Sequence, residues 1–196
     1  YAELPKMFRR PLWKFWHRFI LAHDKKMQFK FMNYGYFNEG KPPLNLKPED
    51  EAERYCINLY EHDLSGVDIA DWDLLEVGCG RGGGASYITR YHNPKTYIGL
   101  DICKKTVKHC NAYYQIPNLR FIHGHAEKLP FADASFEGIV NVESSRCYPD
   151  VQRFFHEVYR CLKPNGYLFF SDMRYKEEFS TLKTQIRKAN LTILHE

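Results

Sequence analysis

The stretch Leu74-Leu75-Glu76-Val77-Gly78-Cys79-Gly80-Arg81-Gly82-Gly83-Gly84-Ala85 decides the fold of this chain. It begins with an apolar run typical of a buried strand and continues into five glycines, among which Gly78, Gly80 and Gly83 have the G-x-G-x-x-G spacing. Glycines permit a tight turn there and let a ligand approach the bare backbone N–H groups at the start of a helix. The stretch therefore predicts a strand, a loop and a helix that bind a nucleoside-bearing cofactor.

A second predicted strand, Thr96–Leu100, ends at Asp101. An acid at the tip of the second strand, about 20 residues after the glycines, is placed to accept hydrogen bonds from both hydroxyls of a ribose. NAD and S-adenosylmethionine both present such a ribose, so Asp101 leaves both open. Glu76 favours S-adenosylmethionine, because a carboxylate suits a cationic sulfonium and an amino group better than a pyrophosphate.

From Asp73 onward, apolar strand-like runs alternate with helical patterns, which indicates βαβ units. The predicted strands are Asp73–Val77, Thr96–Leu100, Asn118–Ile122, Phe136–Val142, Gly166–Ser171 and Leu191–His195. The predicted helices are Gly83–Tyr91, Lys104–Tyr114, Val151–Leu162 and Lys176–Ala189. We therefore expect an α/β core over residues 73–196, with a doubly wound, mostly parallel sheet.

Residues 1–72 have a different pattern, and we expect them to form a helical cap or lid. A broad apolar stripe predicts one helix over Leu12–Leu21, and a second helix is predicted over Pro48–Leu64. Between them, the aromatic and glycine-broken stretch Phe31–Phe37 predicts a loop.

Length, composition and cysteine usage narrow the class of protein. A chain of 196 residues with 44% apolar residues fits one globular unit with a short extension, and no run reaches the roughly 18 apolar residues of a membrane span. The six cysteines include no C-x-x-C pair and have no zinc-ligand spacing, so we expect reduced thiols, no metal site and a cytoplasmic location. A net charge of +4 is too small to indicate a nucleic-acid partner.

The positive charge is concentrated at the N-terminus. Residues 1–30 contain eight Lys and Arg against two Asp and Glu, interleaved with Trp13, Phe15, Trp16 and Phe19. A basic amphipathic helix with aromatic residues on its apolar side can lie in a bilayer interface, so this segment predicts a peripheral membrane contact. The alternative is that the same stripe packs on the sheet or forms part of a substrate lid.

Several motifs together resemble those of class I S-adenosylmethionine-dependent methyltransferases. The motifs are Glu76–Gly84, Gly99–Asp101, Ala126–Phe131, Ser135–Val140 and Arg160–Leu168. Within that class, Gly82–Tyr87 and Asn141–Pro149 look like the phthiotriolone and phenolphthiotriolone methyltransferases, which O-methylate lipids. Asn33–Tyr36 is more distantly similar to the tyrosine-rich motif of sterol methyltransferases.

This resemblance implies a Rossmann-like fold, S-adenosylmethionine as the cofactor and a set of cofactor-binding residues. Glu76, Gly78 and Gly80 would line the methionine and ribose portion, and Asn141 would lie beside the sulfonium. Tyr34 or Tyr36 would fold over the cofactor. The full implied set is Tyr34, Tyr36, Glu76, Gly78, Cys79, Gly80, Asp101, Ile102, His125, Ala126, Glu127 and Asn141.

The chain departs from the family pattern at three places. His125 stands where an acid usually receives the adenine amino group, and Arg146 stands where a histidine is common. Arginine cannot accept a proton in the ordinary pH range, so the candidate bases are Glu143 and Asp172, which follow predicted parallel strands. These acids could instead only cap the helices that follow. The family also has a strand pair after the last predicted helix, which we expect to be incomplete here.

The sequence therefore predicts a methyltransferase that acts on a small, apolar molecule, with O-methylation of a lipid or polyketide-like hydroxyl favoured. One alternative is an enzyme of the same fold that acts on protein or RNA, which the weak basic charge argues against. Another is a catalytically silent binding or scaffold protein, suggested by His125 and Arg146. The sequence makes no prediction of oligomeric state.

Overall fold

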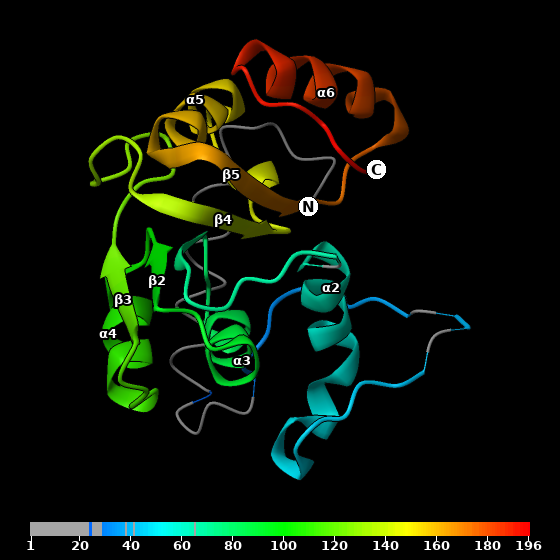
Figure 1. Ribbon diagram of the computed structural model, residues 1–196, viewed down its shortest axis with the longest axis vertical. Coiled ribbons are helices and arrows are strands. Elements are labelled where there is room, and N and C mark those ends of the chain that lie inside the picture. Colours follow the sequence, from blue (N-terminus) through cyan, green and yellow to red (C-terminus); the bar gives the residue numbers. More distant parts are fainter. Residues whose placement is uncertain (1–23, 25–28, 38, 41, 65) are drawn as a thin grey trace.

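The protein has an α/β architecture built on one parallel sheet (Figure 1). The computed structural model describes residues 24, 29–37, 39–40, 42–64 and 66–196. Its five strands are all parallel and lie in the order β3-β2-β1-β4-β5. They are β1 (Asp73–Val77), β2 (Thr96–Asp101), β3 (Leu119–His123), β4 (Phe136–Val142) and β5 (Leu162–Ser171). This arrangement confirms the predicted doubly wound, mostly parallel sheet.

Helices cover both faces of the sheet (Figure 1). Three of them, α2 (Arg54–Leu64), α3 (Gly83–His92) and α4 (Lys104–Tyr113), supply side chains to one apolar core cluster. The other two, α5 (Val151–Cys161) and α6 (Phe179–Lys188), belong to the cluster on the opposite face. Short 3-10 turns precede or follow these helices: η1 (Pro48–Glu53), η2 (Ser145–Cys147) and η3 (Lys176–Glu178). None of the described helices is long and apolar enough to cross a membrane.

The strand order indicates at which edge of the sheet a ligand is expected to bind. The chain runs outward from β1 to β3, then crosses back to β4 on the other side of β1. Strand β1 therefore lies where the direction of winding reverses, and open α/β sheets bind their ligands outside the carboxyl ends of the strands at such a point. The glycine loop leaves β1 at that position.

Most predicted elements are present, with shifted ends. The predicted helix Pro48–Leu64 divides into η1 and α2, and the predicted helix Lys176–Ala189 divides into η3 and α6. Strand β5 begins at Leu162 rather than at Gly166, with an irregular register opposite Phe136 and Gly138. Phe31–Phe37 has no helix or strand, as predicted. The predicted helix Leu12–Leu21 lies outside the described residues.

The prediction of a strand over Leu191–His195 is wrong. This segment has no regular secondary structure. The N–H of Leu191 donates to the carbonyl of Ile186 in α6, and its side chain packs against the core cluster of α5 and α6. Lys183 of α6 also pairs with Glu196. Of the apolar side chains that suggested a strand, Leu191 is thus partly buried against the helices instead of entering the sheet, and Leu194 is exposed.

The turn η1, which contains Asp50, and helix α2, which continues from it, are both fastened to α3 by buried and half-buried polar contacts. The guanidinium of Arg90 donates two hydrogen bonds to the carboxylate of Asp50, at 2.6 and 2.8 Å, and the hydroxyl of Tyr91 donates a third at 2.9 Å. Further along, Glu61 accepts a hydrogen bond from the hydroxyl of Tyr87 at 2.6 Å. These contacts fix the position of α2, which carries Tyr60 and Asp63 to the ligand-binding edge of the sheet.

Candidate active site

The glycine loop is held against the end of β2 by its own backbone. The N–H groups of Gly78 and Cys79 both donate to the carbonyl of Leu100, at 2.7 and 3.1 Å. Gly78 has φ +77°, and a Cβ there would lie 1.9 Å from the hydroxyl oxygen of Ser144. Because L side chains rarely adopt this conformation and no space exists for one, only glycine fits at this turn.

Asp101 faces the loop from the tip of β2. One of its carboxylate oxygens accepts the N–H of Gly80 at 3.1 Å, and the other accepts the N–H of Cys103 at 2.8 Å. Burial raises the pKa of Asp101 to about 6, although these two N–H groups act in the opposite direction. A carboxylate oxygen can accept more than one hydrogen bond, so each oxygen retains capacity for a further donor.

Glu76 is fully buried in β1 between two tyrosines. The hydroxyl of Tyr60 in α2 donates to one carboxylate oxygen at 2.8 Å, and the hydroxyl of Tyr97 in β2 donates to the other at 3.1 Å. Burial raises the pKa of Glu76 to about 7, against the effect of the two hydroxyls. Tyr60 lines the cavity described below, while Glu76 lies behind it. The ring of Tyr60 also touches α3, since a Cβ at Gly84 would lie 2.0 Å from it.

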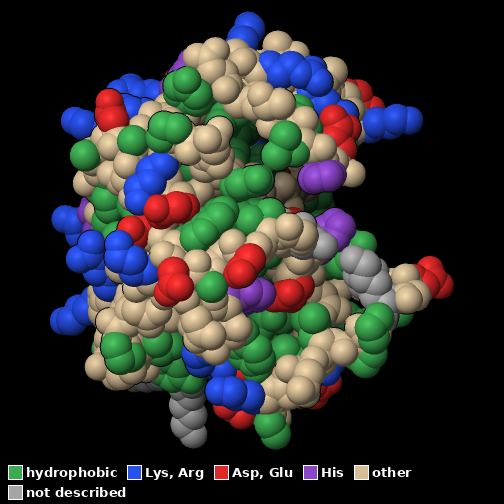
Figure 2. Space-filling model, viewed as in Figure 1, with side chains coloured by type: hydrophobic (Ala, Val, Ile, Leu, Met, Phe, Trp, Pro, Cys, Tyr) green, Lys and Arg blue, Asp and Glu red, His purple; other side chains and the backbone are tan. Residues whose placement is uncertain are grey.

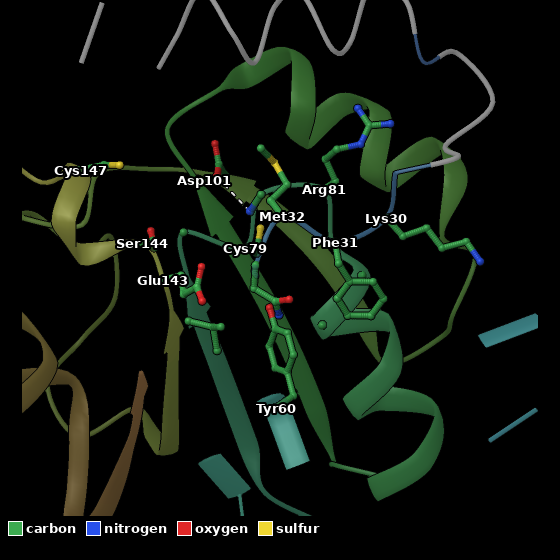
Figure 3. A pocket seen from close by; sticks show the side chains of 16 residues that line it. Lys30, Phe31, Met32, Tyr60, Cys79, Arg81, Asp101, Glu143, Ser144 and Cys147 are labelled. Carbon is green, nitrogen blue, oxygen red and sulfur yellow. Dashed lines mark hydrogen bonds between the residues drawn. The ribbon is translucent and has the colours of Figure 1, made fainter. Parts of the chain in front are cut away.

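A segment from the N-terminal region, residues 29–33 and here called the strap, lies across the glycine loop (Figure 3). The carbonyl of Lys30 accepts the N–H of Gly83 at 3.1 Å, and the carbonyl of Phe29 accepts the guanidinium Nε of Arg81. Arg81 also forms a buried ion pair with Asp24 at 2.6 Å. These contacts bind the strap to the loop that it covers.

A small cavity of about 50 Å³ lies between the strap, the glycine loop and the end of β4 (Figure 3). Five residues of the predicted site line it: Gly78, Cys79, Gly80, Asp101 and Glu143. Gly83 of the glycine motif and Asn33 of the Asn33–Tyr36 motif also line it. For Tyr60, Ser144, Cys147 and the strap residues Lys30, Phe31 and Met32, which line it too, the sequence predicted no role in the site.

The two predicted lid tyrosines lie beside this cavity and do not line it. The backbone N–H of Tyr34 donates to the carboxylate of Glu143 at 3.2 Å, and the guanidinium of Arg146 lies 5.5 Å from the centre of the Tyr34 ring. The ring of Tyr36 stacks on His62 of α2, with the ring centres 4.3 Å apart. Both tyrosines thus secure the chain that continues from the strap.

The residues that follow β3 lie next to Asp101. The N–H of Gly124 donates to the backbone carbonyl of Asp101 at 3.1 Å, which holds this loop beside the end of β2. His125 is exposed, Ala126 is buried, and Glu127 is half-buried with one carboxylate oxygen that has no described partner. Half-buried Ile102 directly follows Asp101. These four predicted cofactor-binding residues are absent from the cavity wall.

At the carboxyl end of β4, Asn141 and Glu143 occupy different surroundings. The amide of Asn141 is fully buried and donates to the carbonyl of Val77 at 2.7 Å and to the hydroxyl of Tyr148 at 2.9 Å. Its own carbonyl oxygen has no partner among the described residues. Glu143 has φ +45°, an uncommon conformation for a residue with a side chain and one that recurs at functional sites.

Geometry separates the two predicted bases. Burial raises the pKa of Glu143, although Arg146, 3.9 Å away, and the N–H of Tyr34 oppose this effect, and its carboxylate lines the cavity. The side chain of Asp172 is fully buried and does not line the cavity. It accepts hydrogen bonds from the Ser145 hydroxyl, the N–H groups of Arg146 and Met173, and the guanidinium of Arg174. Glu143 is therefore the better placed of the two to meet a substrate, and Asp172 organises the loop after β4.

The chain has a doubly wound α/β fold with a cavity at the glycine loop that follows β1. Comparisons with known proteins narrow the class. A family described as "Methyltransferase domain" matches residues 75–170. The phthiotriol/phenolphthiotriol dimycocerosates methyltransferase of Mycobacterium tuberculosis is 37% identical over 185 residues, which are 94% of this chain and 68% of that protein. The chain belongs to the class I methyltransferases.

Two further similarities agree with this assignment. The fatty-acid O-methyltransferase of Mycolicibacterium smegmatis is 38% identical over 182 residues, covering 92% of this chain and 66% of that protein. Among solved structures, a candidate sarcosine dimethylglycine methyltransferase from Galdieria sulphuraria matches with a TM-score of 0.72 and 19% identity, covering 91% of this chain and 75% of that one. The second similarity concerns the fold alone. In the part of the chain that is described, no group of three or more His, Cys, Asp or Glu side chains could hold a metal ion.

The burial of Glu76 predicts how the stability of the ligand-free protein depends on pH. Because its pKa is raised above the ordinary value, the folded protein holds this proton more tightly than the unfolded chain does. The stabilisation is present below about pH 4.5 and is lost as the pH rises to about 7. We expect the Tm of the ligand-free protein to fall across this interval, and Glu76→Gln to reduce the fall. Calorimetry of both proteins from pH 4.5 to pH 8 tests this, with Glu49→Gln on the exposed turn η1 as the control. Equal pH slopes for Glu76→Gln and the parent protein would contradict it.

Proposed function

We propose that the protein is an S-adenosylmethionine-dependent O-methyltransferase whose acceptor is the hydroxyl group of a lipid or a similar apolar molecule. The observation that carries this proposal is the pairing of two carboxylates across one cavity. Asp101 lies at its nucleoside-binding side and Glu143 lies at the end of β4. Membership of the methyltransferase family supplies the reaction class.

The residues around the cavity fit S-adenosylmethionine chemically. Asp101 has two carboxylate oxygens with spare capacity for the ribose hydroxyls. The acids Asp101 and Glu143, which line the cavity, favour a ligand with a cationic sulfonium and amino group over a pyrophosphate. The buried carbonyl oxygen of Asn141 has no described partner, so it could accept a hydrogen bond from the ligand.

The strap has to move for such a cofactor to enter. Pockets for small ligands usually measure about 300–1,000 Å³, whereas this cavity measures about 50 Å³. The strap is fastened to the loop by the contacts of Lys30, Phe29 and Asp24. We infer that the strap opens to admit the cofactor and closes over it, the covering role that the sequence assigned to Tyr34 and Tyr36.

S-adenosylmethionine supplies a methyl group that is open to in-line attack by an oxygen nucleophile. The protein then has to position the acceptor and exclude water, and a hydroxyl acceptor also requires a group that takes its proton. Glu143 fits this role because its carboxylate lines the cavity and burial makes it more basic than an ordinary glutamate. Arg146, which forms an ion pair with Glu143 and lies over Tyr34, would hold that carboxylate in place.

Exposed hydrophobic side chains favour an apolar acceptor. Phe37 and Tyr55 pack together near the continuation of the strap, with ring centres 6.2 Å apart, and both are more than half exposed. Met173, which follows Asp172, is also exposed. In the view of Figure 2, hydrophobic side chains gather toward the middle of the face, and Lys and Arg lie mostly along its edges. Relatives of this chain are named for lipid and fatty-acid methylation.

A hydroxyl acceptor suits this site better than a carboxylate. A fatty-acid carboxylate would need no base, and it would be repelled by an ionised Glu143 at the cavity wall. A neutral hydroxyl avoids this repulsion and makes use of the same carboxylate. The presence of Glu143 therefore favours the reaction on a hydroxyl.

The first prediction concerns the cofactor. Asp101→Ala removes two charge-assisted hydrogen bonds to the ribose, each worth roughly 1.5–3 kcal/mol, so the Kd for S-adenosylmethionine should rise at least about tenfold. Isothermal titration calorimetry measures this, with Asp68→Ala on an exposed turn as the control. Unchanged affinity in Asp101→Ala, or tighter binding of NAD by the parent protein, would overturn the assignment of the cofactor.

The second prediction concerns the base. Glu143→Gln keeps the size of the side chain and removes its basicity, so turnover on a hydroxyl acceptor should fall by roughly 100-fold or more while the affinity for S-adenosylmethionine stays within about twofold. Transfer of a labelled methyl group to long-chain alcohols, to fatty acids and to lipid, protein and RNA extracts measures both activity and acceptor class. Asp172→Asn is the matched comparison. It should lower Tm and reduce turnover less than Glu143→Gln does. Label that enters only protein or RNA would contradict the proposed acceptor class.

We also propose that the protein works in the cytoplasm at a membrane surface, through the basic and aromatic residues 1–30. Support comes from the sequence, in which eight cationic residues of this segment accompany Trp13, Phe15, Trp16 and Phe19. Replacement of Lys6, Arg9, Arg10, Lys14 and Arg18 by Gln should reduce sedimentation with anionic vesicles and leave S-adenosylmethionine binding intact. Binding of the parent protein should weaken as salt is added. If the parent protein fails to sediment with anionic vesicles at low salt, this proposal is wrong.

A further inference from the structure

A further carboxylate, Asp63 of α2, lies close to Glu143 and has no place in the scheme above. The hydroxyl of Ser171, the last residue of β5, donates to the carboxylate of Asp63 at 2.6 Å. The backbone carbonyl of the same Ser171 accepts the N–H of Glu143 at 2.8 Å. One residue of β5 thus joins two acids that come from different elements and are 80 positions apart in the sequence.

The groups around this pair leave Asp63 without a cationic partner among the described contacts. Burial raises the pKa of Asp63 to about 7, the hydroxyl of Ser171 opposes this, and the charge of Glu143 raises it further. Several titratable or polar groups interact with Asp63 or Glu143, and they come from α2, from the strap's continuation and from the loops after β4 and β5. They are Tyr60 and Cys56 of α2, Arg146 and the backbone of Tyr34 beside Glu143, and Asp172 after β5. The only cation in this set, Arg146, acts on Glu143.

We propose that Asp63 is a positioning residue for methyl transfer and that its negative charge strengthens Glu143 as the acceptor of the substrate's proton. This proposal rests on the proposed function. The effect follows from reciprocity, because an interaction by which Glu143 favours the protonated form of Asp63 must equally favour the protonated form of Glu143. With Asp63 ionised, Glu143 is a stronger base than it would be beside a neutral group.

Methyl transfer to a hydroxyl acceptor needs only the methyl donor, the acceptor and the carboxylate of Glu143. The acceptor's O–H bond breaks, and its proton goes to the carboxylate of Glu143. The oxygen forms a bond to the methyl carbon, the bond from that carbon to sulfur breaks, and the sulfur keeps the electron pair as a thioether. The new proton on Glu143 lies beside the charge of Asp63, which stabilises it. Asp63 does not touch the acceptor in this scheme.

Two carboxyl groups that interact this way titrate as a pair, and this gives a test that needs no acceptor. Carboxyl carbon NMR of the full chain, with the Asp63 signal assigned from Asp63→Asn, follows its titration from pH 4 to pH 9. Asp63 should titrate near pH 7 in the parent protein and at a lower pH in Glu143→Gln, because the neighbouring charge is gone. Asp68→Asn, an exposed acid of the nearby turn, should leave the Asp63 titration unchanged.

A second measurement follows the consequence for activity on a long-chain alcohol. In the parent protein kcat should rise between pH 6 and pH 8 as Asp63 ionises. In Asp63→Asn this rise should disappear and kcat at pH 8 should fall by roughly tenfold, with KM for S-adenosylmethionine unchanged; Asp63→Glu should restore the rise. A purely structural Asp63 would change Tm and leave the shape of the pH profile as it was.

Ser171→Ala provides an independent variant if Asp63→Asn does not fold. Loss of the hydroxyl removes the one hydrogen bond that favours ionised Asp63, so its titration, and the rise in kcat, should move to higher pH. The proposal is overturned if Glu143→Gln leaves the Asp63 titration where it is in the parent protein. A parent protein that methylates no hydroxyl acceptor yet shows the coupled titration would contradict the proposed function and leave the charge coupling of the two acids standing.

Discussion

The carbonyl oxygen of Leu100 holds the site together by accepting two hydrogen bonds from the glycine loop, one from Gly78 and one from Cys79. This contact joins the end of β1 to the end of β2, and it can form only where the chain turns with a positive φ and no side chain. Because the loop is tied at this point, the N–H of Gly80 reaches the carboxylate of Asp101. Asp101, the acid proposed to bind the ribose, and the loop that would approach the rest of the cofactor are therefore placed by one backbone arrangement.

The elements outside the sheet act on that arrangement from two sides. Helix α2 brings Tyr60 to Glu76 behind the loop and Asp63 to Ser171 at the end of β5. The strap covers the loop from above through Lys30 and the buried Asp24–Arg81 pair. Since α2 is fastened to α3 by the contact of Tyr87 with Glu61, the helix that contributes these side chains is fixed relative to the glycine loop at whose end α3 begins. Rigid placement of this kind is what a reaction that depends on orientation requires.

The sequence predicted what depends on local pattern and failed where long-range packing decides. Strands β1, β2 and β4 and the glycine loop have strong local signals, since apolar runs and glycines at fixed spacing allow few other structures. The segment Leu191–His195 carries a similar apolar signal, yet Leu191 packs against the core cluster of α5 and α6 and Leu194 is exposed. Periodicity alone cannot distinguish this arrangement from a strand. Tyr60 and Met32 line the cavity through contacts with residues far along the chain, and no motif marks them. Asp101 and Glu143 could be predicted because they directly follow strands at the edge where such sheets bind ligands.

Several carboxyl groups at this edge of the sheet are buried, although burial makes a carboxyl group harder to ionise. Glu76, Asp101 and Asp63 are all carboxyl groups whose pKa burial raises toward neutrality, so in the ligand-free protein each is harder to ionise than it would be in water. For a structural role alone, apolar residues of similar size would fill these positions at lower cost. A ligand that brings hydroxyl donors and a positive charge would compensate the desolvation of Asp101 when it binds, so the cost of burying this acid would favour that kind of ligand. Asp63 is different, because nothing in a nucleoside cofactor needs it. In the proposed reaction, its position beside Glu143 gains a use only when a proton has to be taken from an acceptor. On that proposal, Asp101 serves binding of the methyl donor, and Asp63 serves activation of the acceptor.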